Sequence, residues 1–175
     1  MLGSTPPLAT FIDGWGIYNR CIVDALRGLD DEALASRTAP QQWTIWQIAS
    51  HIAGARPYWL GLVGVDADAL RDRFRVSSTT VPGLDLADAG WEDDETHPRG
   101  SGELVNALTG TWDAVFASVS RWTADDLEAT FERPYGRTRS FTRAWVIWHL
   151  LEHDIHHGGE ISQILGANGL PAPDL

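Results

Sequence analysis

The sequence predicts an all-α protein, a four-helix bundle with a long crossover between helices two and three. Four stretches place apolar residues at spacings of mostly three and four, which is the period of an amphipathic helix. No alternating strand pattern of useful length accompanies them. A long segment without a sustained period separates the second stretch from the third. A crossover of that length allows the helices that it joins to run parallel, which a tight turn does not.

Length, charge and cysteine content limit the class of protein. With 175 residues, we expect residues 1–175 to form a single domain that buries a core without disulfides. Thirteen basic and 24 acidic residues give a net charge of −11, which repels phosphate backbones and argues against nucleic acid as a partner. The single cysteine, Cys21, excludes an internal disulfide and a cysteine-rich metal site, and its mid-helix position favours a small core residue.

The sequence carries no signal for export or membrane insertion. The N-terminal residues lack the basic and apolar regions of a secretory signal. Charge, glycine, proline or histidine interrupts every apolar run before it reaches the length of a membrane-spanning helix. We therefore expect a cytoplasmic protein without membrane association.

The first half of the chain contains two predicted helices. The first covers residues 8–29, and the polar residues 30–40 that follow form a connector with one turn of helix. Thr44 and Gln47 make a capping box ahead of an apolar run that reaches Val63, so the second helix begins there. Pro57 removes a backbone donor, which predicts a kink near Ala53 or an early end of the helix.

The crossover covers residues 64–100 and includes an acidic tract at residues 91–95. Its first part, residues 66–74, is compatible with a further helical segment. Connections as long as the whole crossover are usually functional or mobile in compact domains.

The second half of the chain contains the other two long helices. Ser101 caps the third, which extends to Trp122 and is followed by a short capped turn at residues 123–127. Residues 133–140 form a loop or a small hairpin, and Ser140 caps the fourth helix. That helix continues until glycines and a proline stop it after Leu165.

The last predicted helix holds four of the six histidines within nine residues. On a helix, His149, His153 and His157 share one face, whereas His156 is turned about 100° from His157. The one-turn spacing of His153 and His157 lets two imidazoles bind one metal ion. The pair also fits a solvated helix face, and His149 fits a fourth ligand, a hydrogen-bonding partner or a packing residue.

A third nitrogen ligand would come from the second helix, where His51 lies on or beside the apolar stripe. The resulting three-histidine site would keep open positions and would suit zinc, nickel or a similar divalent ion. The competing interpretation of His51 is a hydrogen-bonded core residue. Trp43, Trp46 and Trp59 frame His51 along the chain, either as walls of an apolar pocket or as core residues. His97 is expected to be a solvated loop histidine.

Two motifs and a closing turn resemble the DinB/YfiT-like superfamily. The first motif is the capped, tryptophan-led segment at residues 42–53 that carries His51. The second is His153-x-x-x-His157-x-Gly159-Glu160, followed by the glycine- and proline-containing turn at residues 165–171. In order and spacing, the resemblance covers nearly the whole chain.

The resemblance implies a four-helix bundle of up-down-down-up topology, often dimeric, with a divalent metal held by three histidines. By resemblance those ligands are His51, His153 and His157, and zinc or nickel is the expected metal. Family members of known chemistry use low-molecular-weight thiols, as in mycothiol- or bacillithiol-dependent transferases and maleylpyruvate isomerase. We therefore expect thiol-dependent transferase or hydrolase chemistry on a small molecule, and a homodimer.

The chain departs from the family pattern at two positions. Glu160 stands where the family usually has Gln, and Gly158 where it often has Arg, so any substrate contact from position 158 is in doubt. Glu160 is our candidate catalytic residue, as a proton acceptor near the metal. It would alternatively hydrogen-bond a ligand imidazole or form a surface ion pair.

Four arginines near the start of the last helix offer a basic mouth for an anionic substrate or simply balance the acidic surface. They are Arg133, Arg137, Arg139 and Arg143. The main alternative to an enzyme is a metal- or small-ligand-binding protein without chemistry, such as a stress-related helical protein. A helical interaction module with structural histidines is the third function that the sequence allows.

Overall fold

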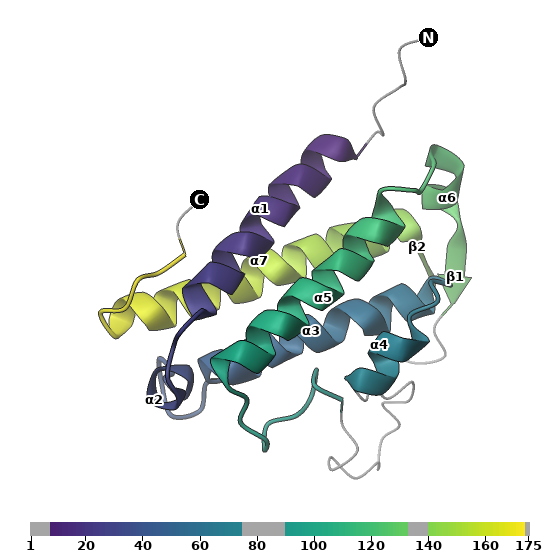
Figure 1. Cartoon of the computed structure of the whole chain (residues 1–175). Coiled ribbons are helices and arrows are strands. Elements are labelled where there is room, and N and C mark those ends of the chain that lie inside the picture. Colours follow the sequence, from purple (N-terminus) through teal and green to yellow (C-terminus); the bar gives the residue numbers. More distant parts are fainter. Residues whose placement is uncertain (1–7, 75–89, 133–139, 174–175) are drawn as a thin grey trace.

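The computed structural model describes residues 8–74, 90–132 and 140–173. Four long helices lie side by side in it (Figure 1): α1 (Ala9–Leu26), α3 (Ile45–Leu62), α5 (Ser101–Val119) and α7 (Arg143–Ala167). The shorter elements are α2 (Asp31–Leu34), α4 (Asp68–Arg73), α6 (Ala124–Glu128), β1 (Thr130–Glu132) and β2 (Ser140–Thr142). The all-α class predicted from the sequence is confirmed, and β1 and β2 add a small antiparallel sheet.

The contacts between the long helices fix their neighbours and directions. Helix α3 packs against α5 and α7, and α1 packs against the same two helices. Ser101 at the start of α5 donates its hydroxyl to the Leu26 carbonyl at the end of α1, so these helices are antiparallel. Arg143 at the start of α7 donates from Nε to the Val63 carbonyl just after α3, so α3 and α7 are also antiparallel.

The core has two apolar clusters along the bundle. The first halves of α3 and α5 meet in one, around Ile48 and Leu104, and their second halves meet in the other, around Trp59 and Val115. Helices α3 and α5 therefore run in the same direction, as the long crossover between them allows.

A buried ion pair lies between the two clusters. Arg56 and Asp154 are both fully buried, and Arg56 Nη2 lies 2.7 Å from Asp154 Oδ2. Asn19 Oδ1 and the Leu108 carbonyl accept further hydrogen bonds from Arg56, and Trp15 Nε1 donates to Asp154 Oδ2 at 2.6 Å. Although burial alone would raise the pKa of Asp154, the charge of Arg56 lowers it, so the carboxylate is ionised. Side chains from α1, α3 and α7 thus meet at one charged centre.

Two predicted caps are confirmed and two are wrong. Thr44 with Gln47 caps α3, and Thr123 with Asp126 caps α6, both as complete capping boxes. Ser140 instead belongs to β2, and Thr142 caps α7 by accepting from the Trp145 N–H. The N-cap of α5 is Gly100, which has no side chain to accept a hydrogen bond, and Ser101 is the first helical residue and donates its hydroxyl to α1.

Other local predictions are mostly confirmed. The turn of helix in the first connector is α2, and residues 66–74 contain α4 as a separate helix after Gly64. Pro57 lies inside α3, which continues to Leu62, so the early end is excluded. Residues 133–139, where the sequence predicts a loop or small hairpin, lie outside the described residues, and the flanking strands β1 and β2 pair antiparallel.

Within the described ranges, no helix combines the length and apolar character needed to cross a membrane.

Candidate metal centre

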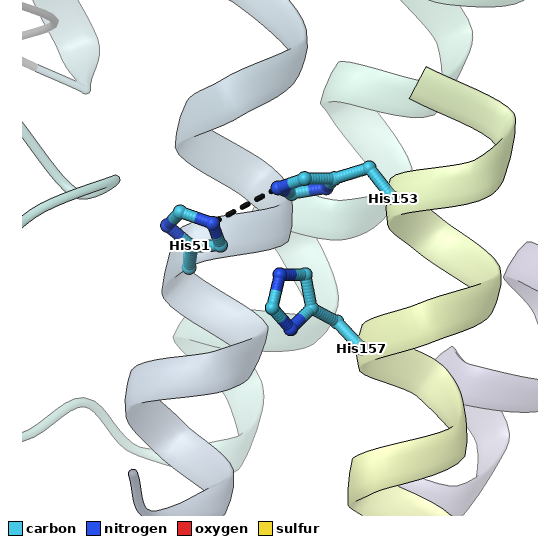
Figure 2. Close-up of side chains that lie close together, drawn as sticks. All are labelled: His51, His153 and His157. Atoms are coloured by element: carbon cyan, nitrogen blue, oxygen red, sulfur yellow. Dashed lines mark hydrogen bonds between the residues drawn. The ribbon is translucent and has the colours of Figure 1, made fainter. Parts of the chain in front are cut away.

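Three histidines from two helices converge at one point between α3 and α7. His51 projects from α3, and His153 and His157 project from successive turns of α7 toward it (Figure 2). Each offers a ring nitrogen, and these three atoms lie within 4.8 Å of one another. The ring centroids of His51 lie 4.7 Å from His153 and 4.8 Å from His157. The structure thus brings together the three residues that the family resemblance implies as ligands.

The outer nitrogens of two of these rings are held by acceptors. His51 Nδ1 lies 2.6 Å from the Glu92 carbonyl oxygen, and His157 Nδ1 lies 2.7 Å from Glu160 Oε2. A carbonyl and a carboxylate can only accept, so in both rings the proton is on Nδ1 and the lone pair is on Nε2. A hydrogen bond at the outer nitrogen is the usual way in which a metal-ligating histidine is oriented.

Both rings are neutral near pH 7. Burial is the main reason that the pKa of His51 is lowered to about 4. The hydrogen bond to the Glu92 carbonyl raises this pKa, and the neighbouring rings of His153 and His157 lower it to a smaller extent. Burial also lowers the pKa of His157, opposed by the hydrogen bond to Glu160. The neutral ring is the form that binds a metal ion, since its lone pair is free.

The third ring has a different environment. His153 Nε2 lies 2.9 Å from His51 Nε2, which carries a lone pair, so His153 donates from Nε2 in this hydrogen bond. Its other nitrogen, Nδ1, is buried and has no hydrogen-bond partner in the described part of the chain. Asp154 Oδ1, at 4.0 Å from that nitrogen, is a second buried atom without a partner among the described residues.

Trp43, just before α3, and residues 92–95 of the crossover pack beside His51 and form one wall of the site. Trp43 packs its ring against His51, with centroids 4.8 Å apart, and donates from Nε1 to Glu95 Oε1. The Glu95 carbonyl accepts from Gln47 Nε2. The crossover backbone passes so close to α3 that a Cβ on Gly54 would overlap the Glu92 amide. Gly54 therefore lets the Glu92 carbonyl reach His51.

A pocket of about 290 Å³ opens beside His157 and Glu160. Most of its lining is polar, with hydroxyl, amide and carboxylate groups around the Trp43 ring. The lining residues are Thr38, Gln41, Gln42, Trp43, Ile48, His157, Glu160, Gln163 and Ile164. Its size suits a small molecule adjoining the histidines.

The remaining histidines lie outside the three-histidine cluster. His149 stacks on Trp145, with centroids 4.9 Å apart, and meets the Trp59 ring edge-on. His156 is exposed, with Nε2 at 3.5 Å from Glu160 Oε1, and the set His156, His157 and Glu160 is a second group of possible ligands. His97 is an exposed loop residue, as expected, and contacts Asp94.

The structure decides the open roles of several supporting residues. Trp46 and Trp59 are core residues, the second of the two roles expected for them, and Trp59 contacts His149. Cys21 is half-buried instead of fully buried. Gly158 packs against α1, where a Cβ would overlap the Tyr18 hydroxyl, so position 158 has no room for the arginine common in the family.

The proposed basic mouth can be checked at one of its four arginines. Arg143 donates to the Val63 carbonyl and pairs with Asp126, which is a role within the fold. Arg133, Arg137 and Arg139 lie outside the described residues.

Sequence reasoning missed two elements of the site. The Glu92 carbonyl left no signal, because every residue carries one. Asp154 left a signal, since it shares the helical face of the buried Leu150, Gly158 and Ile161. An acidic residue on a buried stripe needs a partner, and that partner is Arg56.

Comparisons with known proteins identify the family and support the fold. The sequence-family model of the DinB superfamily matches residues 22–161. The chain belongs to the DinB superfamily. The crystal structure of a DinB-like protein from Bacillus cereus matches with a TM-score of 0.67 at 20% identity, covering 98% of this chain and 99% of that one. At this identity, the likeness to that DinB-like protein supports the fold alone. No curated protein matches the chain.

Proposed function

We propose that this DinB superfamily member is a metal-dependent enzyme that carries out thiol-dependent transfer or hydrolysis on a small molecule. His51, His153 and His157 would hold one divalent ion, zinc or nickel. The observation that carries the proposal is the convergence of three imidazoles, two of which have the outer nitrogen held by an acceptor and the inner lone pair directed into the cluster.

The residues present fit a divalent metal. Three neutral nitrogen donors suit zinc and nickel, and three protein ligands leave coordination positions open. The buried, unpartnered His153 Nδ1 and Asp154 Oδ1, recorded for the described residues, also fit, because a metal on Nε2 would require the proton on Nδ1. When bound at such a site, a divalent ion acts as a Lewis acid that lowers the pKa of a coordinated water or thiol.

The chain's own residues would bind the substrate and move its proton. The pocket beside His157 would receive the small molecule, with the Trp43 ring as an apolar wall and amide side chains as hydrogen-bonding partners. Glu160 Oε2 holds His157, whereas Oε1 lies 3.5 Å from His156 Nε2. Oε1 is thus the atom that would accept a proton from a thiol or water in the pocket.

The partners that we propose follow from charge and surface. A low-molecular-weight thiol fits a pocket of this volume. The net charge of −11 disfavours nucleic acid and anionic membranes as partners of what we propose to be a cytoplasmic protein.

Exposed large apolar side chains, among them Trp148 and Ile155 on α7, support a homodimer. Light scattering at micromolar concentration, repeated on the Trp148→Glu variant, tests the dimer: a monomeric wild type would contradict it.

Elemental analysis of protein purified without a histidine tag tests the metal. We expect about one divalent ion per chain, lost in His51→Ala and in His157→Ala and retained in the control His97→Ala, an exposed loop residue. A screen of thiol transfer and ester hydrolysis would follow, with chelation abolishing turnover. Absence of metal after equilibration with zinc or nickel at neutral pH would overturn the proposal. Metal without turnover would indicate a non-catalytic metal-binding protein.

A further inference from the structure

We propose that Asp154 positions His153 for metal binding by accepting a hydrogen bond from its Nδ1. This inference rests on the proposed three-histidine metal centre and assigns a role to a residue outside it. Asp154 follows His153 in the chain but points away from the cluster into the buried centre of the bundle, where it meets Arg56 and Trp15.

One carboxylate oxygen of Asp154 is already fixed. Oδ2 accepts from Arg56 Nη2 at 2.7 Å and from Trp15 Nε1 at 2.6 Å, and the side chain is fully buried. These two bonds come from α3 and α1, so they set the orientation of the carboxylate independently of His153. The other oxygen, Oδ1, faces His153 Nδ1 at 4.0 Å, and neither atom has a hydrogen-bond partner among the described residues.

A neutral His153 cannot satisfy both of its neighbours. With its proton on Nε2 it donates to His51 Nε2 at 2.9 Å, and its Nδ1 lone pair then faces a carboxylate, which can only accept. With its proton on Nδ1 it would donate to Asp154 Oδ1 once the two atoms approach from 4.0 Å to hydrogen-bond distance, and two Nε2 lone pairs then face each other. A cation between the Nε2 atoms removes this second conflict, because both lone pairs then bind it.

The arrangement therefore couples the two ends of the ring. A metal ion on His153 Nε2 requires the proton on Nδ1, where Asp154 Oδ1 would accept it in a hydrogen bond. The carboxylate would therefore stabilise the tautomer that binds the metal. A carboxylate behind a ligating histidine also raises the basicity of the ring and fixes its orientation. His51 and His157 already have acceptors at Nδ1, the backbone carbonyl of Glu92 and the carboxylate of Glu160, and Asp154 would provide the acceptor for His153.

The variant Asp154→Asn keeps the size and shape of the side chain but removes the charge that pairs with Arg56, so its stability is measured alongside its zinc affinity. Its amide oxygen can still accept from Arg56 and Trp15, and its NH₂ group then faces His153 Nδ1 and stabilises the tautomer that cannot bind metal through Nε2. We expect zinc affinity, measured by competition with a chromophoric chelator, to fall about 10–100-fold. In the control Asp24→Asn, the same exchange at an exposed carboxylate of α1, we expect affinity within about threefold of wild type. Circular dichroism confirms that each variant is folded.

Nitrogen-15 NMR of the histidine rings in the wild-type chain provides a readout that does not depend on any variant folding. At pH 8 we expect the His153 proton on Nε2 in the zinc-free protein and on Nδ1 in the zinc-loaded protein. A proton that stays on Nε2, or protons on both nitrogens before zinc is added, would overturn the inference. So would zinc affinity within threefold of wild type in folded Asp154→Asn. A wild-type chain that binds neither zinc nor nickel would instead overturn the metal centre itself, and the role of Asp154 with it.

Discussion

Two sites on the same face of α7 show how one helical spacing leads to different chemistry. His153 and His157 meet His51 across the interface with α3, whereas His149, one turn earlier, lies against Trp59 and Trp145. All three α7 histidines are spaced four residues apart. The difference comes from α3, which presents an imidazole at one level and an indole two turns later. Spacing along one helix places side chains on a face, and the opposing helix decides whether they meet nitrogen or an aromatic ring.

The largest expected effect comes from removing one histidine from each of these two sites and comparing the affinities for zinc. In His153→Ala, the affinity for zinc should fall by more than the roughly 10–100-fold typical of losing an outer partner, because a direct ligand is removed. In His149→Ala, one turn away, affinity should stay close to that of wild type. Isothermal titration of both variants checks this. Equal losses in the two variants would contradict the distinction between the sites.

The second prediction concerns the ion pair beneath the histidine cluster. Arg56→Met leaves the buried Asp154 without its opposite charge, and we expect the free energy of unfolding to fall by about 3–5 kcal/mol. The control Arg27→Met removes an exposed pair with Asp24 and should cause no measurable change. Urea denaturation measures both. A similar stability for the two variants would show that the pair does not hold the bundle centre.

The third prediction is a pH dependence of the metal-free protein. The pKa of His51 is about 4 in the folded chain and that of His157 is also lowered, whereas an unfolded histidine titrates near 6.5. Between these values the unfolded chain binds more protons, so the free energy of unfolding decreases as the pH falls from about 6.5 toward 4. We expect a decrease of about 1–3 kcal/mol between pH 7.5 and pH 5, measured with a chelator present. His51→Gln should reduce this dependence, and an unchanged dependence would contradict the assignment.

The smallest expected effect compares two adjacent glycines that follow the cluster on α7. A Cβ on Gly158 would overlap Tyr18 and Ile22 of α1, so Gly158→Ala should lower the free energy of unfolding by about 1–3 kcal/mol. A Cβ on Gly159 meets no described atom within 4 Å, so Gly159→Ala should raise it by about 0.5–1 kcal/mol through helix propensity. Thermal unfolding measures both, and effects of the same sign would refute the close α1–α7 contact.

Much of the fold was predictable because the signals are local. The apolar period located four long helices, and the capping box at Thr44 and Gln47 located the start of α3 to the residue. The wrong caps share one cause: Ser101 and Ser140 have the right side chain for a cap but are used elsewhere. Ser101 bonds α1, and Ser140 lies in a strand whose partner is β1. Those alternatives come from segments distant in the sequence.

The sequence by itself determined the helices, the one-turn spacing of His153 and His157, and the family resemblance that singled out His51. These are properties of short segments, and the period of the α-helix turns them into faces. Only the tertiary structure decided which nitrogen of each ring faces the cluster, because the Glu92 carbonyl and Glu160 set the protons on His51 and His157. It also decided that Asp154 lies between Arg56 and His153, since that position depends on three helices packing around one buried charge.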